Sequence, residues 1–306
     1  MNRVIKVSKI GKIKTINEAL SLINKNEKAT IEIASGIYYE KLKITSSYIT
    51  LKGVGIGKTI ITYDDYSKKI HKDGRDYNTF RTPTLTIVGH DCKLLDLTIE
   101  NAVDSNNHGQ AVALAIYGDK FKAENVEIKG DQDTLFLGPL PDDLKDRYMD
   151  FLPRDELFIE GYLTSLFKKC IITGGVDFIF GNGVALFDKC DIVSIKEGYV
   201  TAPSHSLYQK HGFTFSECKF INKTPSFDNV YLVRFWRPFG KVNFLNCSYE
   251  NHIKKEGVTP WNNKLPLIYS RVYEVPKSAG RATYVKELTS FQAERLITEL
   301  DKILKY

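Results

Sequence analysis

The chain has 306 residues, of which 42% are hydrophobic and 26% charged, and its formal net charge at pH 7 is +6. These values are typical of a soluble globular protein with a sizeable core. No stretch approaches the roughly 20 apolar residues that span a membrane, and no basic run indicates nucleic-acid binding. We therefore expect no membrane or nucleic-acid partner, while the mild positive charge suits an acidic substrate.

The N-terminus and the cysteines predict the compartment. The chain begins Met1-Asn2-Arg3-Val4-Ile5, without the apolar core or cleavage site of a signal peptide. Its five cysteines are odd in number and show neither a CxxC pair nor a metal-site spacing. Reduced, buried thiols are therefore expected rather than disulfides. We expect a cytoplasmic protein, or a secreted one if the chain is a processed form, with no metal site.

Two segments near the chain ends carry the signature of a helix start. Residues 15–18 read Thr-Ile-Asn-Glu and residues 289–292 read Thr-Ser-Phe-Gln, each a capping box before apolar residues at helical spacing. The first helix would present Ile16, Ala19 and Ile23 on one face. We expect both helices to be amphipathic and to cover the two ends of the fold.

Between these helices the chain reads as short strands and turns with an internal repeat. Copies begin at Asp96, Asn125, Cys170, Cys190, Cys218 and Cys247, in steps of 29, 45, 20, 28 and 29 residues. A phenylalanine lies three positions before each cysteine copy. Periods of 20 to 30 residues with one strand per repeat indicate a solenoid. The step of 45 is either two rungs or one rung with a long insertion.

Stacked rungs place equivalent positions in line, so the four repeat cysteines should form an interior ladder of small apolar side chains. A parallel β-helix also explains the terminal helices, because its open ends expose strand edges and core. A β-sandwich is the alternative, but it needs more Asn-Gly or Asp-Gly turns than the sequence holds. We predict an all-β, single-domain parallel β-helix over residues 1–306, with an N-terminal capping helix and a C-terminal helix.

Two aspartates lie in strings of strand-forming and aromatic residues. Asp133 belongs to Gly-Asp-Gln-Asp-Thr-Leu-Phe at 130–136, and Asp177 to Val-Asp-Phe-Ile-Phe-Gly at 176–181. An unpaired charge among such residues is costly. Two buried carboxylates in unequal environments can divide acid, base and nucleophile roles between them. The alternative interpretation is that both are ordinary turn or ladder aspartates.

Further polar residues lie where strands are expected. Gln110 begins an alternating segment, Gln132 adjoins Asp133, and Arg234 and Trp236 alternate onto one face of their strand. Because neighbouring rungs stack about 4.8 Å apart, residues far apart in sequence can meet. Each one alone has an ordinary structural explanation, whereas together they predict a site. Glycine-rich phosphate loops, nucleophile elbows and zinc motifs are absent from the sequence.

These strings, in this order, resemble the pectin methylesterases of bacterial type, carbohydrate esterases with a right-handed parallel β-helix fold. The resemblance runs nearly end to end and is carried by residues 36–40, 53–61, 110–114, 132–136, 177–181, 199–202 and 234–236. It implies hydrolysis of galacturonate methyl esters in pectin or oligogalacturonides, with release of methanol. No cofactor is implied, and we expect a monomer.

The resemblance also implies roles for the polar residues. Asp177 is similar to the nucleophile that attacks the ester carbonyl. Asp133 is similar to the acid that protonates methanol and then to the base that activates water. Gln110 and Gln132 resemble the donors that stabilise the oxyanion, which forms during acyl transfer.

Four further residues complete the expected site. Arg234 resembles the partner that keeps the nucleophilic carboxylate ionised and oriented. Trp236 is similar to part of the sugar-binding floor, and with Phe136 and Phe180 it is expected to contact substrate. A carboxylate is a weak nucleophile, so a fixed cation and preset dipoles make chemical sense.

The chain departs from the family pattern in two places. The family's Leu-Gly-Arg-Pro-Trp is replaced by Leu-Val-Arg-Phe-Trp at 232–236, and residues 138–166 form an insertion. We expect this insertion to be a long loop beside the cleft that restricts the length or pattern of the substrate. Two other classes of function remain open. The first is a catalytically weak protein that binds uronate saccharides. The second is a different β-helix enzyme, either a polygalacturonase or a pectate lyase, but the sequence lacks the additional carboxylates that these two enzymes would need.

Overall fold

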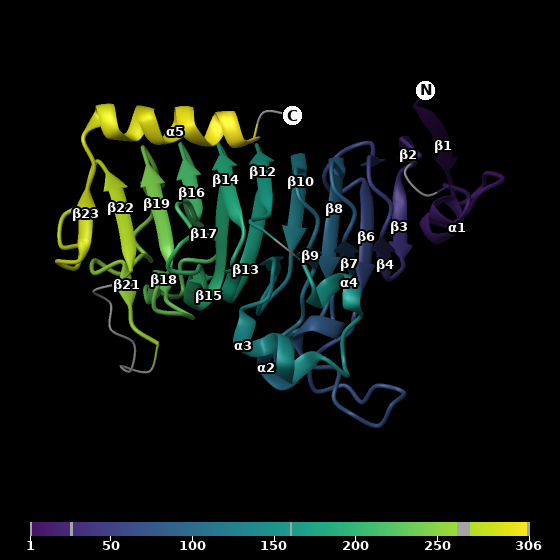
Figure 1. Cartoon of the computed structure of the whole chain (residues 1–306), viewed down its shortest axis with the longest axis horizontal. Coiled ribbons are helices and arrows are strands. Elements are labelled where there is room, and N and C mark those ends of the chain that lie inside the picture. The colour runs from purple at the N-terminus through teal and green to yellow at the C-terminus, as the bar shows by residue number, and fades with distance from the viewer. Residues whose placement is uncertain (1, 25–26, 160, 262–269, 305–306) are drawn as a thin grey trace.

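The computed structural model describes residues 2–24, 27–159, 161–261 and 270–304. Within these residues the strands form one continuous 23-stranded array. The strand pairs follow one another along a single long axis, with the N-terminal strands at one end and the C-terminal strands at the other (Figure 1). The pairs between neighbouring rungs are parallel, as in the predicted β-helix.

The pairings divide the strands among three faces. The first face contains β1 (Arg3–Val7), β2 (Ala29–Ile33), β5 (Ile49–Lys52), β12 (Thr164–Lys168), β14 (Val184–Asp188), β16 (Phe213–Ser216), β19 (Lys241–Leu245), β22 (Arg271–Val275) and β23 (Val285–Glu287). The second contains β3 (Gly36–Tyr39), β6 (Thr59–Tyr63), β17 (Lys219–Asn222) and β20 (Ser248–Tyr249). The third contains β4 (Leu42–Ile44), β7 (Leu85–Ile87), β9 (Leu114–Ile116), β11 (Leu135–Leu137), β18 (Val230–Arg234) and β21 (Val258–Thr259).

Four long strands bend from one face to the next. They are β8 (Lys93–Asn101), β10 (Phe121–Lys129), β13 (Ile171–Gly181) and β15 (Asp191–Pro203). The helices are short except for the last: α1 (Ile16–Ser21), α2 (Ser105–His108), α3 (Asp142–Lys145), α4 (Arg154–Leu157) and α5 (Ser290–Leu304), with 3₁₀ turns at Thr79–Arg81 and Asp146–Tyr148. None of the described helices has both the length and the apolar content of a membrane span.

In six rungs the chain turns from the first face to the second at a residue in the left-handed conformation. The corners are Asp96, Asn125, Lys169, Lys189, Glu217 and Asn246, with φ between 52° and 54°. The residue after each corner faces the core, so Leu97 lies opposite Val126, and Glu127 pairs with Ile171 on the next rung. The predicted register is therefore wrong by one residue in the first two copies. Asp96 and Asn125 are corners, and the positions equivalent to Cys170 are Leu97 and Val126. The 45-residue step is one rung with an insertion.

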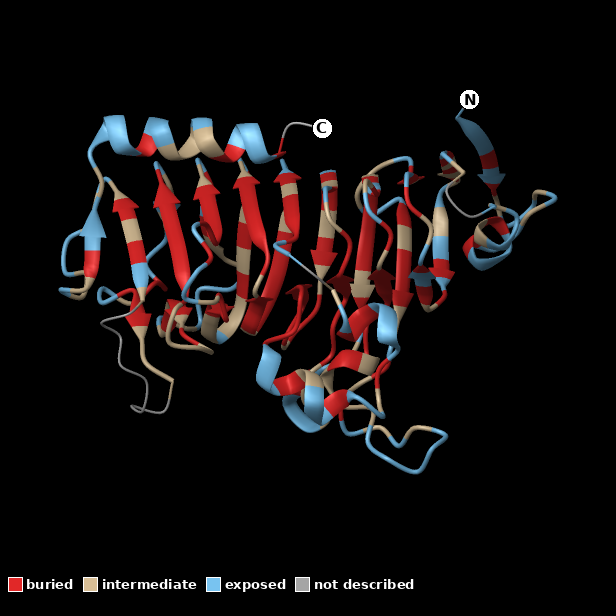
Figure 2. Ribbon diagram, viewed as in Figure 1, coloured by how far each residue is buried: buried red, intermediate tan, exposed pale blue. Residues whose placement is uncertain are grey.

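Two side-chain ladders fill the interior beneath the first face. Cys170, Cys190 and Cys218 are buried and Cys247 is partly buried, which confirms the predicted cysteine ladder. Beside it, four phenylalanines stack with ring centroids 4.6 to 5.3 Å apart: Phe167, Phe187, Phe215 and Phe244. Near-parallel stacking follows from the repeat, since each ring occupies the same position one rung further on. Figure 2 shows these strands as a largely buried wall.

The two terminal helices differ from each other in what they cover. In α1 the Thr15 hydroxyl accepts a hydrogen bond from the Glu18 amide at 3.1 Å, and Ile16 and Ala19 join the core, as expected of a cap. The prediction that the C-terminal helix covers the other end is wrong. Helix α5 lies along the outside of the first face (Figure 1), where Leu300 packs with Leu186. Outward-facing apolar residues on β14 require that cover.

Candidate active site

The two aspartates lie on neighbouring rungs at the edge of the third face. Gln132 forms a parallel bridge with Val176, and the Asp133 amide donates to the Val176 carbonyl at 3.0 Å. Asp133 and Asp177 therefore occupy adjacent rungs, and the stacking expected from the repeat brings the two residues together. Both have positive φ, 62° and 49°. The left-handed region is one that aspartate adopts more readily than most residues, and the corner residues of the other rungs share it.

Arg234 holds the Asp177 carboxylate in a fixed plane. Its Nε donates to Oδ1 at 3.1 Å, and its Nη2 donates to Oδ2. The guanidinium is itself enclosed, because its carbon lies 3.8 Å from the ring centre of Tyr199 and 4.1 Å from that of Trp261. A planar fork held between two aromatic faces has few other orientations. The orientation of Asp177 is therefore set by the whole arginine assembly.

The electrostatic environments of the two carboxyls differ. Burial raises the pKa of Asp133 well above its ordinary value, and the nearby Asp177 charge raises it further. Burial also raises the pKa of Asp177, but there the hydrogen bonds and charge of Arg234 oppose the effect. No arginine among the described residues forms an ion pair with Asp133, although the Arg234 charge and a hydrogen bond from Gln132 partly oppose the rise of its pKa. The geometry thus favours a protonated Asp133 beside an ionised Asp177, which is the unequal pair that acid and nucleophile roles require.

Gln132 lies on the same rung as Asp133, and Gln110 lies on the rung before it. The Gln110 side-chain oxygen accepts a hydrogen bond from the Ser67 hydroxyl at 2.8 Å, which directs its amide N–H groups elsewhere. Gln110 and Gln132 both line the cavity that holds the aspartates. Gln110 does not belong to a strand, contrary to the expected alternation. It follows α2, and β9 begins only at Leu114.

The cavity above these residues has a volume of about 480 Å³, within the usual range of about 300 to 1,000 Å³ for small-ligand sites. Its walls include the aromatic residues Phe80, Tyr148, Phe180, Trp236 and Trp261. The expectation for Phe136 is wrong, because its ring has no exposed surface and lies beneath Phe80 and Phe180 at 5.1 and 5.0 Å. Phe136 supports the floor from below.

Several residues of this cavity were not singled out from the sequence. Trp261 comes from the segment after β21, and Tyr148, Arg147 and Asp143 come from the insertion. No local pattern marks them, since their approach to the cavity depends on how distant segments meet. Tyr199 lies in a string that carried the family resemblance, and that string was the available signal for it.

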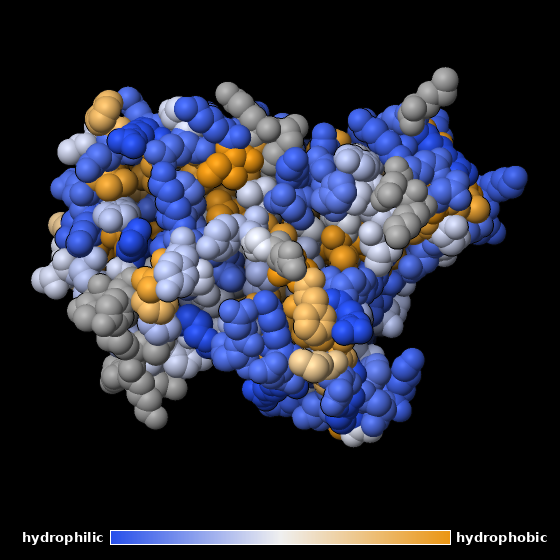
Figure 3. All heavy atoms as spheres, viewed as in Figure 1, coloured by the Kyte–Doolittle hydropathy of each residue, from blue (hydrophilic) through white to orange (hydrophobic). Residues whose placement is uncertain are grey.

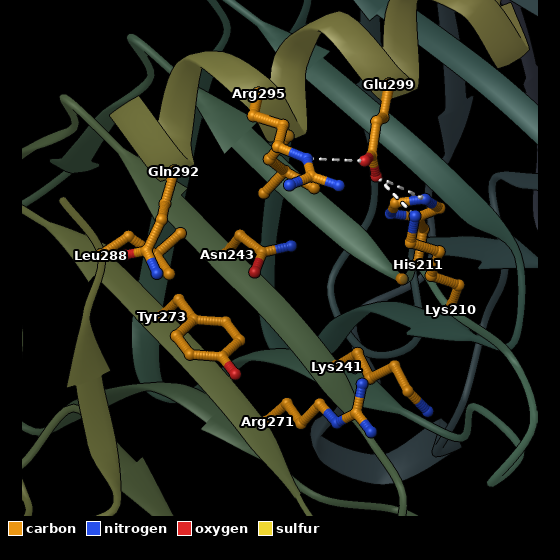
Figure 4. A pocket seen from close by; sticks show the side chains of 12 residues that line it. Lys210, His211, Lys241, Asn243, Arg271, Tyr273, Leu288, Gln292, Arg295 and Glu299 are labelled. Carbon is orange, nitrogen blue, oxygen red and sulfur yellow. Dashed lines mark hydrogen bonds and ion pairs between the residues drawn. The ribbon is translucent and has the colours of Figure 1, made fainter. Parts of the chain in front are cut away.

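A second cavity, of about 240 Å³, lies between α5 and the strands β19 and β22 (Figure 4). In it Glu299 receives hydrogen bonds from Arg295 at 3.2 Å and from Lys210 at 2.7 Å. Its lining contains one carboxylate and no second one that could form an acid and nucleophile pair. Across the described residues, no cluster of three or more His, Cys, Asp or Glu could hold a metal ion. The paired-carboxylate cavity is the stronger candidate site.

The parallel β-helix thus brings two unequal carboxyls, an arginine and two amides together in one cavity. A family model described as Pectinesterase matches residues 2–139 and 154–306. The chain therefore belongs to the pectinesterase family. The residues between the two matched parts lie inside the insertion.

Individual relatives agree with this assignment. The chain is 31% identical to probable pectinesterase/pectinesterase inhibitor 64 of Arabidopsis thaliana, over 84% of this chain and 42% of that protein. It is also 31% identical to pectinesterase QRT1 of the same plant, over 86% and 66%. The chain thus spans less than two thirds of these relatives' length. Pectin methylesterase PemA from Erwinia chrysanthemi superposes with a TM-score of 0.78 and 28% identity, over 98% of this chain and 96% of that one.

Proposed function

We propose that the protein hydrolyses the methyl esters of galacturonate units in pectin or oligogalacturonides and releases methanol. The observation that carries this proposal is the Asp177–Arg234 pair beside Asp133 in one aromatic-walled cavity, where burial raises the pKa of Asp133 well above its ordinary value. A related pectin methylesterase, 28% identical, has been crystallised in complex with a hexasaccharide. Neither a metal ion nor an organic cofactor enters the proposed reaction.

In the first half of the reaction an ionised Asp177 oxygen attacks the ester carbonyl carbon. The carbonyl oxygen becomes an oxyanion, which accepts hydrogen bonds from the amide groups of Gln110 and Gln132. When the tetrahedral intermediate collapses, the carbon–methoxy bond breaks and Asp133 gives its proton to the departing oxygen. The products of this half are methanol and an acyl-enzyme on Asp177, with Asp133 ionised.

In the second half a water molecule takes the place of methanol. The Asp133 carboxylate accepts a proton from that water while the water oxygen attacks the acyl carbon. The bond to Asp177 breaks, so the galacturonate carboxyl group leaves, Asp177 is again ionised, and Asp133 is again protonated. Arg234 contributes throughout by holding the leaving and attacking carboxylate in one orientation.

The test is methanol release from methyl-esterified pectin and from short methylated oligogalacturonides, with Asp177→Ala and Asp133→Ala as the variants. We expect both substitutions to abolish release, because each removes a group that forms or breaks a bond. Activity that survives both would overturn the mechanism. A wild-type protein that binds uronate saccharides but releases no methanol would establish the binding function instead.

We further propose that the protein acts as a monomer in a reducing compartment. The hydrophobic groups on the face in Figure 3 are interrupted by hydrophilic side chains, whereas stable self-association favours larger continuous patches. The five cysteines are all free. Light scattering coupled to size exclusion would test the first point, and a dimer at micromolar concentration would contradict it.

A further inference from the structure

The insertion at residues 138–166 lines the catalytic cavity and is anchored to residues of the early rungs by hydrogen bonds and ring contacts. Arg81 donates to the Phe151 carbonyl at 2.9 Å, and its guanidinium carbon lies 3.5 Å from the centre of the Phe151 ring. The Tyr148 hydroxyl donates to the Asn78 side chain at 2.9 Å. Figure 1 shows α3 and α4 below the strands, on the same side as α2. The insertion is therefore a folded wall rather than the simple loop expected from the sequence.

On its other side an ion pair joins the insertion to the segment after β18. Arg237 Nε donates to Asp143 Oδ1 at 3.2 Å, and a second bond joins Nη2 to Oδ2. The same arginine lies over the Trp236 ring, 4.9 Å from its centre, and donates to the Trp236 carbonyl at 3.0 Å. Trp236 thus holds the Arg237 side chain in place, and Asp143 joins the insertion to Arg237.

This link separates two hollows. Asp143 and Arg237 line the catalytic cavity, and both also line an adjoining outer hollow of about 830 Å³. The outer hollow carries exposed aromatic side chains, Tyr162 at 49% and Tyr208 at 87%, of the kind on which sugar rings stack. A sugar chain that occupied both hollows would have to pass the ion pair.

We propose that the Asp143–Arg237 link is a specificity barrier that favours short galacturonate esters over long chains. The proposal rests on the proposed esterase function. Short substrates fit within the catalytic cavity, whereas a polymer also reaches the outer hollow and must first separate the pair. The Asp143 side chain is 60% exposed, and exposed ion pairs are weak. The barrier therefore lowers the rate on polymers without excluding them.

The test compares Asp143→Asn with the wild type on methyl-esterified pectin and on fully methylated trigalacturonate. We expect the ratio of kcat/KM for polymer over trimer to rise about two- to fivefold, which is the range that one exposed ion pair can account for. Asp142→Asn is the matched control, because it removes the same charge from the same helix and Asp142 pairs with Lys145 instead. An unchanged ratio in Asp143→Asn, or an equal rise in the control, would overturn the proposal.

A binding measurement separates this proposal from the esterase function. The only two tryptophans in the sequence, Trp236 and Trp261, both line the catalytic cavity, so quenching of their fluorescence reports its occupancy. Polygalacturonate and trigalacturonate are the probes. A larger gain in polymer binding than in trimer binding in Asp143→Asn would support the barrier even if no methanol were released. Equal effects on both probes would count against it. Both variants should fold, since the insertion keeps its contacts to Arg81 and Asn78.

Discussion

The substitution Arg234→Lys tests whether orientation of the nucleophile, rather than charge alone, sets the rate. Lysine keeps the positive charge but supplies a point donor in place of the planar fork. It would lose one of the two hydrogen bonds to Asp177 and the close stacking between Tyr199 and Trp261. A hydrogen bond to a charged group contributes about 1.5 to 3 kcal/mol. If that contribution is lost in the transition state, kcat falls about 10- to 150-fold.

Methanol release across a pH series provides the readout. In Arg234→Lys the retained charge should hold the acidic limb of the profile near its wild-type position while kcat falls. In Arg234→Gln the opposing charge is gone, so the pKa of Asp177 rises further and the acidic limb moves to higher pH. An Arg234→Lys enzyme that stays within about threefold of wild-type kcat would refute the claim that geometry sets the rate.

Arg281 offers a matched control for this experiment. It donates to the buried Glu274 at 3.0 Å and lies 4.9 Å from the Tyr249 ring, so it also combines a carboxylate with an aromatic face. It does not line the catalytic cavity. Arg281→Lys should lower the melting temperature and leave kcat unchanged. A fall in kcat in this variant would mean that the loss in Arg234→Lys reflects general destabilisation.

Three further predictions concern the acid, the amide donors and the core. Asp133→Asn should abolish methanol release and raise the melting temperature, by an amount that increases with pH. The reason is that the native state keeps the Asp133 proton above pH 3.8, whereas the unfolded chain loses it. A rise in melting temperature that becomes smaller at higher pH would contradict this. Gln110→Ala and Gln132→Ala should each lower kcat about 100- to 1,000-fold with little change in KM, measured by steady-state kinetics, and a change in KM alone would assign them to ground-state binding. Phe215→Ala should lower the free energy of unfolding by about 3 to 5 kcal/mol in urea denaturation, because its ring is fully buried between two stacked neighbours.

The repeat made the fold accessible from the sequence. Interior positions recur once per rung, and a cysteine or phenylalanine at the same place in successive rungs is visible without a structure. The register of the first two copies was not visible, because a left-handed corner at Asp96 or Asn125 turns the side chain outward. An aspartate or asparagine at such a corner looks the same in sequence as one at the start of a strand.

The candidate site divides in the same way. Asp133, Asp177 and Arg234 could be predicted because each belongs to a distinctive string and the rungs bring the strings together. Trp261 and Asp143 could not, since they enter the cavity from segments outside the repeat. The burial of Phe136 could not be predicted, because alternation along the strand does not show that the rings of Phe80 and Phe180 lie between Phe136 and the cavity. The path of α5 depends on apolar residues on the outside of β14, which resemble core residues in sequence.

The altered arginine strand shows how a changed sequence can keep a functional geometry. Val233 and Phe235 replace the glycine and proline of the family pattern, and both side chains are fully buried in the core. Their burial leaves Arg234 and Trp236 directed to the cavity by simple alternation. The larger ring at Phe235 needs space, and Gly240 provides it: a Cβ there would lie 2.4 Å from the ring. Gly240 thus leaves room for the Phe235 ring, and the Arg234 guanidinium is held between Tyr199 and Trp261.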